Sequence, residues 1–517
     1  MKKIILYINT LLTISILSAC GDFLEPQSQS ETTPKDVNSL NELLLGNAIP
    51  TRTVNPKDIT SLLTVIDDDI TMHPFVETKL GEPSQYEERT ILSLYQLYTW
   101  QPYYSREITE RGAGGVVYNL YEAYYEYILG CNAVLDYLDK VTGSKAEKDW
   151  VKAQALSLRA FYYLQLVNIY APPYNKDKNA LGVVLKLTAQ VEDKKLHRNT
   201  VQEVYTQIEN DLLEAEQLFN ELPVARQWKK DYRPSLPMVQ FLLARMYLYM
   251  ENWAEAAKYS SKIIDDWSFS LNDLNSYPNP ATNIYFPDFK TYSSTESIWV
   301  YGISGNSNYG NVNTVFRSAS SITVFEASKE LTDSFEEGDL RKEKYIVQVN
   351  EGSGANARTV YRAYGKTLLT TGKSNPKVAE NGFGHAFRLA EVYLIYAEAK
   401  AQLSSFGDAI DALNILRKKR FKPANYQDIS GVSGNMLIEL VRQERRKELC
   451  FEALRWFDLK RYGMPQIEHI WIDSPDSQNK YTLTQADNFY AVPIPYKVLD
   501  ENSAIIQNPL PPLRQPN

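Results

Sequence analysis

The chain has 517 residues, of which 44% are hydrophobic and 12% aromatic, and its formal net charge at pH 7 is −8. The sequence is mildly acidic and suggests no basic clusters, so the chain is not expected to bind nucleic acid. Beyond the first twenty residues, no apolar run approaches the length of a membrane-spanning helix.

The N-terminus has the layout of an export signal. Lys2 and Lys3 precede an apolar stretch that ends in Leu17-Ser18-Ala19-Cys20. An apolar run of roughly 14 residues is too short to cross a bilayer core of about 30 Å. Small residues before a cysteine form the lipobox of bacterial lipoproteins, so we expect residues 1–19 to be removed and Cys20 to be lipidated. The alternative is an ordinary secretory signal with an incidental cysteine.

Residues 20–33 are expected to form a flexible tether, because they are rich in Gln, Ser and Thr. Several acyl chains on Cys20 would hold the protein stably on a membrane. Asp22 and Glu25 weakly resemble an acidic surface-export signal, which predicts a protein lipid-anchored in the outer membrane and facing outward.

Apolar residues at helical spacing predict three helices in the N-terminal half of the body. Two prolines after Tyr170 end the second helix, and Thr200 with Glu203 forms a capping box at the start of the third. The predicted ranges are 116–138, 150–170 and 200–219.

Two helix pairs follow the tetratricopeptide pattern, one at 236–250 with 253–264 and the other at 387–403 with 408–420. Small residues in each pair allow close approach of the two backbones. They are Ala244, Ala254, Ala256 and Ala257 in the first pair, and Ala397, Ala399, Ala401, Ala409 and Ala412 in the second. Such pairs bury their apolar faces only by stacking on neighbours, so we predict a mainly α-helical scaffold.

The body, 34–517, divides by composition into an N-terminal helical part (34–269), an insertion (270–385) and a C-terminal helical part (386–517). The insertion is rich in Asn, Ser, Gly, Pro and aromatic residues, and residues 297–301 resemble a strand. We therefore predict a loop-rich mixed segment inserted between helical parts that do not form a regular solenoid.

Aromatic residues in loops are the candidate ligand contacts, because sugar rings stack on aromatic faces and loops on rigid scaffolds carry binding residues. The alternative, packing in the core, stays open for Trp100, while the helically spaced tyrosines from Tyr118 to Tyr127 are expected in the core. The candidates are Trp100, Tyr103, Tyr104, Tyr285, Tyr292 and Tyr309.

No metal or cofactor site is predicted. Asp67-Asp68-Asp69 lacks the spacing of a calcium loop and is read as a solvated turn or helix cap, with Ca²⁺ as the alternative. The four histidines are scattered, and the glycine-rich segment 112–115 lacks the lysine of a phosphate loop. Cys131 and Cys450 are expected to be buried thiols, with a disulfide between them as the alternative.

Several segments resemble the SusD/RagB family of outer-membrane nutrient-uptake lipoproteins. The most specific segment is 442–461, RQERRKELCFEALRWFDLKR, in which Ala453 stands where the family usually has glycine. Further matches are FRLAEVYLIYAEA at 387–399, Leu158-Arg159-Ala160, and Pro493-Ile494-Pro495 followed by Gln507-Asn508-Pro509.

The resemblance implies a binding protein without enzymatic activity or cofactor. Its implied partner is a TonB-dependent outer-membrane transporter of the SusC/RagA type, to which it would deliver a glycan or, in some members, a peptide. A surface glycoside hydrolase and a pure docking scaffold remain the alternatives. No ligand-binding residue can be carried over, because the family's motifs do not include ligand contacts.

Four charged residues of the most specific segment are expected to form a structural ion-pair network. Glu452, Arg455, Asp458 and Arg461 are spaced three apart, so a helix would place opposite charges side by side among apolar residues. Buried charges persist only when paired. The alternative is a catalytic carboxylate, since a glycosidase needs two carboxylates at a short separation.

Overall fold

The computed structural model describes most of the body. The described residues are 33–50, 61–72, 94–106, 120–277, 290–302, 325–351, 358–362, 383–474 and 477–516. The predicted sites at Cys20, Tyr285 and Tyr309 lie outside these ranges.

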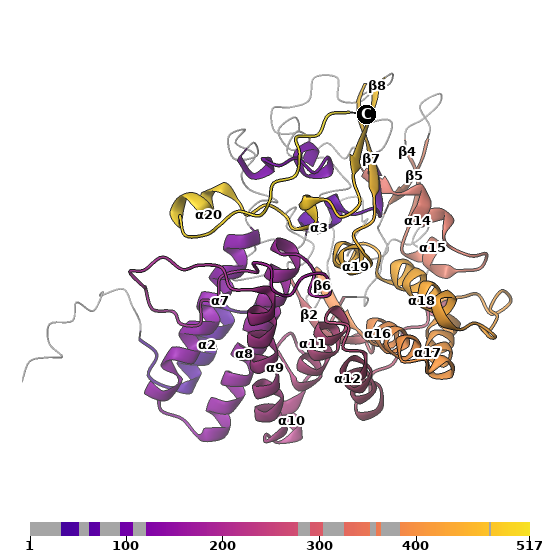
Figure 1. Ribbon diagram of the computed structural model, residues 1–517. Helices are drawn as coiled ribbons and strands as arrows, with labels where there is room; N and C mark the ends of the chain where they lie inside the picture. The colour runs from indigo at the N-terminus through magenta and orange to yellow at the C-terminus, as the bar shows by residue number, and fades with distance from the viewer. Residues whose placement is uncertain are drawn as a thin grey trace, which may run out of the picture.

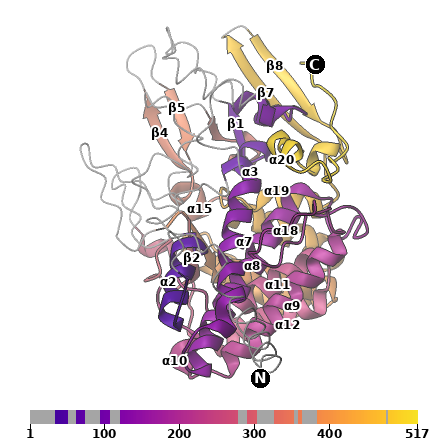
Figure 2. The ribbon, with the colours of Figure 1, turned by 90° about the vertical axis from the view of Figure 1, so that its left-hand side faces the viewer.

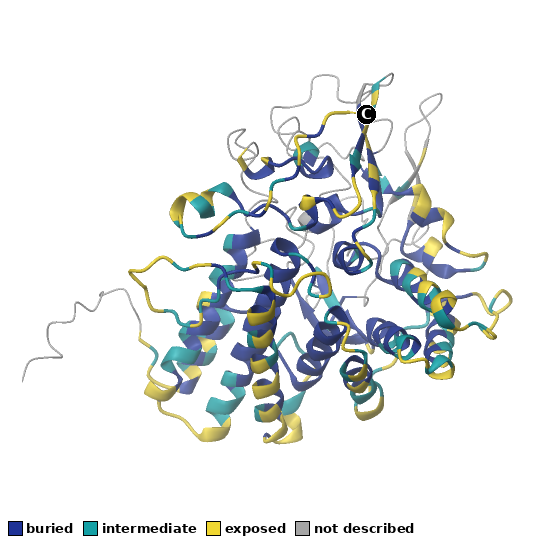
Figure 3. Cartoon of the chain, in the orientation of Figure 1, coloured by how far each residue is buried: buried dark blue, intermediate teal, exposed yellow. Residues whose placement is uncertain are grey.

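The N-terminal part is a series of packed helices (Figure 1). Helix α7 packs on α2 and α8, α8 on α9, α9 on α11, and α11 on α12. Their bounds are α2 Val37–Asn47, α7 Leu120–Tyr137, α8 Lys145–Tyr170, α9 Val201–Asn220, α10 Val224–Gln227, α11 Leu236–Tyr249 and α12 Trp253–Asp266. Buried residues face the neighbouring helices and exposed residues face outward (Figure 3).

Local sequence signals fix the ends of these helices. The predicted capping box of Thr200 and Glu203 is present at α9, and Ser144 with Glu147 forms a second one at α8. These caps supply partners to backbone N–H groups that no helical carbonyl reaches. Helix α8 therefore begins at Lys145, five residues before the predicted start, and ends before Pro172 as predicted.

The two predicted helix pairs are confirmed and are neighbours in space. Helices α16 (Leu389–Gln402) and α17 (Phe406–Lys418) form the second pair, and α16 packs directly on α12 of the first pair (Figure 1). The predicted small contacts are buried in both pairs except Ala254, which is exposed. The pairs therefore stack as tetratricopeptide units do, with the insertion leaving and rejoining the stack between them.

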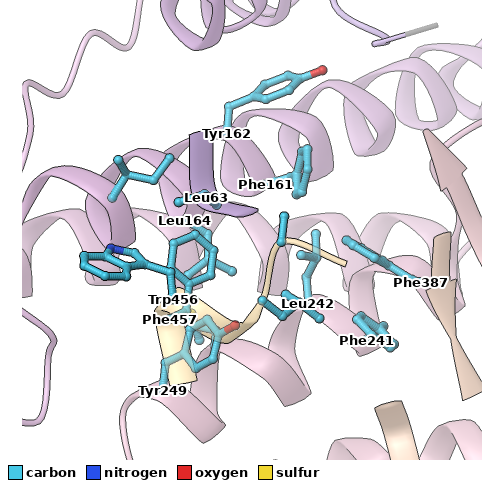
Figure 4. Close-up of a cluster of buried hydrophobic side chains, with 14 of the residues drawn as sticks. Leu63, Phe161, Tyr162, Leu164, Phe241, Leu242, Tyr249, Phe387, Trp456 and Phe457 are labelled. Carbon is cyan, nitrogen blue, oxygen red and sulfur yellow. The ribbon is translucent and has the colours of Figure 1, made fainter. Parts of the chain in front are cut away.

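The prediction that a helix begins at Phe387 is wrong, because this residue lies in strand β6 (His385–Arg388). Strand β6 pairs antiparallel with β2 (Ser297–Tyr301), the strand predicted within the insertion. Phe387 is fully buried and stacks on Phe241 at 4.5 Å between ring centroids (Figure 4). Its ring also meets that of Trp299 at 5.1 Å. Apolar spacing alone does not distinguish a strand buried on both faces from the first turn of a helix.

The remaining strands form three more two-stranded antiparallel sheets among the described residues, in the pairs β1–β3, β4–β5 and β7–β8. The β4–β5 and β7–β8 hairpins project from the end of the molecule opposite α10 (Figure 2). Their bounds are β1 Ile70–Met72, β3 Phe325–Ala327, β4 Val347–Glu351, β5 Arg358–Arg362, β7 Ile467–Ser474 and β8 Ser477–Leu483.

Six further helices and three 3₁₀ turns complete the described structure. They are α3 Ser61–Ile66, α14 Lys329–Asp333, α15 Leu340–Lys344, α18 Gly434–Leu449, α19 Arg455–Arg461 and α20 Tyr496–Glu501, with the 3₁₀ turns Leu138–Lys140, Leu274–Ser276 and Asn488–Tyr490. Helix α19 inserts Trp456 and Phe457 into the aromatic core beside Tyr249 of α11 (Figure 4).

Cys131 and Cys450 are both buried, and neither forms a disulfide. Burial raises the pKa of the Cys131 thiol, so this side chain is a small core residue rather than a reactive thiolate. Among the helices that the structure describes, none combines the length and apolar character required to cross a bilayer.

The turns of the two helix pairs share one backbone device. Glu251 follows α11 with φ of 59° and Ser404 follows α16 with φ of 60°, and in each turn the next residue is the N-cap of the second helix. A left-handed conformation costs a non-glycine residue about 1–2 kcal/mol. Both pairs therefore contain a small amount of strain at the same position.

Replacing Ser404 by glycine should relieve this strain. Ser404 is exposed, so the change loses no buried contact. We expect Ser404→Gly to raise the free energy of unfolding by about 1 kcal/mol, measured by urea denaturation. Ser404→Ala retains a Cβ and serves as the matched control, with no comparable gain expected. Equal stability of the glycine and alanine variants would contradict the interpretation.

Candidate functional site

The structure places Trp100 in the core. Its side chain is 0% exposed, its indole N–H donates to the carbonyl oxygen of Ile66 at 2.9 Å, and its ring stacks on His469 at 4.2 Å. A ligand requires an accessible ring face, and Trp100 offers none in this arrangement. Of the two possibilities that the sequence leaves open for this residue, the contacts favour packing.

Tyr104 is also a packing residue. It is buried, and its hydroxyl donates to the carbonyl oxygen of Pro493 at 3.1 Å. Gln101 of the same segment donates to the carbonyl oxygen of Arg514 and accepts from the backbone N–H of Arg514. The predicted aromatic loop is therefore fastened to the C-terminal tail, and the prediction of ligand contact is corrected for Tyr104, because its ring is covered.

Tyr103 points outward from this fastened segment. It is 42% exposed, and its ring lies 6.2 Å from that of Tyr496, the first residue of α20. The guanidinium carbon of Arg106 lies 4.2 Å from the centre of the Tyr496 ring, and the backbone N–H of Tyr496 donates to Ser105 Oγ at 3.2 Å. We call Tyr103, Arg106 and Tyr496 the aromatic platform.

The aromatic platform combines two chemistries that recognise sugars or other polar ring compounds. Its rings present faces for stacking, and the Arg106 guanidinium presents several N–H donors in a fixed geometry. Sequence spacing alone does not associate Tyr496 with Tyr103, because nearly four hundred residues separate the two. The available signal was its position directly after the Pro493-Ile494-Pro495 motif.

Tyr292 belongs to a different cluster. It is half-buried, and its ring lies 6.4 Å from that of Phe383. The ammonium group of neighbouring Lys290 donates to the carbonyl oxygen of Gly384 at 2.7 Å. His385 follows in strand β6, where burial, reinforced by the charge of Lys290, lowers the pKa of its imidazole to about 3. Because Tyr292 is only half-buried, it stays a candidate ligand contact.

The four predicted network residues are all paired and mostly buried, but not along one helix. Glu452 pairs with Arg388 at 2.5 Å, Arg455 with Asp68 at 2.7 Å, and Asp458 with Arg461 at 2.9 Å. Only the last pair joins helical neighbours. The expectation of i, i+3 pairing throughout is therefore wrong for Glu452 and Arg455.

The reason is a break between α18 and α19. Phe451 and Ala453 have φ of 61° and 60°, so the helix is interrupted between Leu449 and Arg455. Ala453 is the position where the family usually has glycine, and a left-handed backbone is the conformation that glycine adopts without strain. The charges that a continuous helix would align instead reach other segments.

The centre of the charged network is Glu448 of α18. Its carboxylate pairs with Arg388 of β6 at 3.0 Å and with Arg420, just after α17, at 3.0 Å, and Glu296 beside β2 pairs with the same two arginines at 2.6 and 3.2 Å. None of the four side chains is more than 1% exposed. The surrounding arginines hold the pKa of Glu448 far below its usual range, so the carboxylate stays ionised.

The prediction of a solvated turn at residues 67–69 is wrong. Asp67 and Asp69 are buried, and Asp68 and Asp69 pair with Arg446 and Arg455 at 2.7 to 3.3 Å. The paired arginines keep the pKa of Asp68 low. Across the described ranges, no group of three or more His, Cys, Asp or Glu side chains is arranged to hold a metal ion.

These features define a class of protein: a stack of helix pairs that carries loop-rich insertions and an exposed aromatic platform. Residues 308–510 match the profile described as the SusD family, and residues 22–248 match one described as "Starch-binding associating with outer membrane". The chain belongs to the SusD/RagB family, as its motifs predict.

Two curated relatives come from Formosa agariphila. SusD-like protein P25 is 27% identical over 138 residues, which cover 27% of this chain and 25% of the relative. SusD-like protein P2 is 30% identical over 128 residues, which cover 23% of this chain and 24% of the relative. Each match thus spans about a quarter of the relative's length.

Solved structures share the fold over nearly the whole chain. A SusD superfamily protein from Bacteroides thetaiotaomicron superposes with a TM-score of 0.67 at 20% identity, covering 92% of this chain and 98% of that one. A SusD-like carbohydrate binding protein from Bacteroides vulgatus gives a TM-score of 0.60 at 24% identity, covering 87% and 89%.

Removing the charge of Glu448 should destabilise the whole protein. Glu448→Gln leaves Arg388 and Arg420 with one counter-charge fewer in a site without water access, and breaking such a buried pair typically costs about 3–5 kcal/mol. The measurement is the free energy of unfolding in urea. Glu468→Gln, which breaks an exposed pair with Lys480, is the matched control and should cost under about 1 kcal/mol. A cost below 1 kcal/mol for Glu448→Gln would show that the network is not structural.

The buried imidazole of His385 predicts a pH dependence. Its folded pKa of about 3 lies below the ordinary 6.5, so between these values the unfolded chain binds a proton that the folded chain does not. Stability is therefore complete above pH 6.5 and decreases as the pH falls.

The test measures unfolding between pH 6.5 and 5 and compares variants, so that carboxylates titrating in this range contribute equally to each. His385→Asn should reduce the slope by up to about 1.4 kcal/mol per pH unit. His197→Asn, at an exposed site, is the matched substitution. An unchanged slope in His385→Asn would contradict the assignment.

Proposed function

We propose that this protein captures a glycan at the outer face of the outer membrane and passes it to a TonB-dependent transporter of the SusC/RagA type. Two findings support carbohydrate as the ligand class. The profile matched by residues 22–248 is described as starch-binding, and one structural neighbour is described as a carbohydrate binding protein. The outer-membrane setting is supported by the same profile description.

The observation that carries the proposal is that buried and hydrogen-bonded residues hold the aromatic platform in place. Trp100 and Tyr104 on either side of Tyr103 are buried and hydrogen-bonded, and Ser105 holds the start of α20. Tyr103 and Tyr496 are therefore presented from an ordered segment. Binding to a preorganised surface loses little conformational entropy, which favours capture of a flexible oligosaccharide.

The state of the buried carboxylates supports binding without catalysis. A glycosidase needs a carboxylic acid that remains protonated near the working pH and faces the substrate. Arginines hold the pKa values of Glu448, Glu444 and Asp458 below their usual range. Burial raises the pKa values of Asp67, Asp69 and Asp211, but all three side chains are enclosed in the core and cannot reach a surface ligand.

The anchor in this proposal is an acylated Cys20, with residues 20–33 as the tether that leads to α2. Anchoring keeps the protein at the membrane through several acyl chains, while the body remains free to sit over the transporter. Delivery requires release, so moderate affinity is expected. Capture of a peptide by the same platform is the alternative, and calorimetry with oligosaccharides and with peptides separates the two.

Removing the Tyr103 ring should weaken glycan binding. An aromatic stacking contact contributes about 0.5–1.5 kcal/mol, so we expect Tyr103→Ala to raise the Kd about two- to tenfold. Titration calorimetry against an oligosaccharide panel measures the change, and chromatography of the incubated sugars should show no cleavage. Tyr103→Phe retains the ring and should bind as the native protein does.

Unchanged affinity in Tyr103→Ala would show that the aromatic platform does not bind the glycan. Tyr292 would then be the remaining candidate among the described residues. Binding of peptides but of no glycan would favour the alternative ligand class. Cleavage of an oligosaccharide by the purified protein would overturn the proposal of a non-catalytic role.

A further inference from the structure

One loop carries a basic excess that the overall composition conceals. Between Pro223 and Pro234 the chain has four cations, Arg226, Lys229, Lys230 and Arg233, and one anion, Asp231, on a protein of net charge −8. Among the described residues, no salt bridge is formed by Lys229 or Lys230, and both side chains are exposed. The prediction that the chain lacks basic clusters is therefore wrong for this loop, which we call the basic loop (223–234).

Half-buried aromatic rings pack against the side chains of the basic loop. The guanidinium carbons of Arg226 and Arg233 each lie 5.2 Å from the centre of the Trp150 ring. Trp228 within the loop is half-buried and meets the ring of Trp267, after α12, at 6.3 Å between ring centroids. Partly exposed tryptophans beside cations are the combination found at the level of lipid headgroups in membrane-bound proteins.

The basic loop is fixed to the helix that follows the tether. Arg233 donates to the side-chain oxygen of Asn41 in α2 at 2.8 Å, and the indole of Trp299 donates to the carbonyl oxygen of Tyr232 at 2.8 Å. Just before α2, Asp36 forms a β-bridge with Thr142. Helix α10, which opens the loop, and the start of α2 lie at the same end of the helical stack (Figures 1 and 2).

We infer that the basic loop docks the body onto phosphate-bearing lipid headgroups of the membrane in which the chain is anchored. The inference rests on the proposed anchoring through Cys20. The thirteen residues from that position to residue 33 span at most about 45 Å when fully extended, so the anchored body cannot leave the vicinity of the surface. Electrostatic attraction acts within about 8 Å at physiological ionic strength. A body held on a short tether comes repeatedly within that distance of the membrane surface.

The lysines of the basic loop are the charges available to an anionic surface. Acidic residues also lie at this end of the stack, namely Asp231 in the loop, Asp265 and Asp266 at the end of α12, and Asp149 and Glu221, which both pair with Lys145. Lys229 and Lys230 form no salt bridge with any of them. Each lysine or arginine close to an anionic membrane contributes about a fivefold gain in affinity. An acidic surface of a partner protein would also attract these cations, and that possibility is an outcome of the test.

The test uses the mature chain, residues 20–517 with Cys20→Ser, so that no acyl chain contributes to binding. Its retention on sedimented vesicles of phosphatidylcholine with about a third phosphatidylglycerol is compared with retention on phosphatidylcholine alone. We expect binding to the anionic vesicles only, reduced about 25-fold by Lys229→Gln with Lys230→Gln. The matched control is Lys194→Gln with Lys195→Gln, another pair of adjacent exposed lysines.

Equal loss in both double variants, equal retention on both kinds of vesicle, or no retention at all would overturn the inference. Loss of binding to an acidic polypeptide such as polyglutamate, with vesicle binding unchanged, would assign the loop to a protein partner and would also overturn it. Glycan affinity of the same variants, measured by calorimetry, should be unchanged. Because that readout is separate, failure of membrane docking and failure of the proposed glycan capture are distinguishable.

Discussion

The structure depends on a small group of charges that has no access to water. Glu448 of α18 and Glu296, just before β2, share Arg388 of β6 and Arg420, just after α17. Ionised groups are tolerated in a core only when each has a counter-charge and hydrogen bonds. Displacing any one of the four segments would leave a buried charge unpaired, so the group permits only one arrangement of the segments around it.

This constraint extends to the candidate site through contacts that can be followed residue by residue. Arg446, two residues before Glu448 in α18, and Arg455, the first residue of α19, both pair with Asp68. A nitrogen of the His469 ring lies 2.9 Å from the carbonyl oxygen of neighbouring Asp67, and the ring stacks on Trp100. Trp100 in turn fixes the segment from which Tyr103 projects. The charged network of the family motif therefore has a role in placing the aromatic platform, although it contacts no ligand itself.

What the sequence predicted correctly was local. The helix pairs, the capping box at Thr200 and the strand at 297–301 follow from short-range periodicity and capping, and the structure has all of them. The errors concern partners distant in sequence. Phe387 lies in a strand because β2 pairs with it, Asp68 is paired rather than solvated because Arg455 reaches it, and Tyr496 joins Tyr103 across most of the chain. A single sequence contains no direct signal for such contacts.

The most direct test of the central claim is native-state hydrogen exchange at increasing urea concentration. If the buried charges unite the segments, amides of β2, β6 and α18 should exchange through one opening reaction, with a common free energy and a common dependence on urea. Exchange in β2 and β6 at a much lower opening free energy than in α18 would contradict the account, because it would show that the strands separate from the helix while the network remains closed.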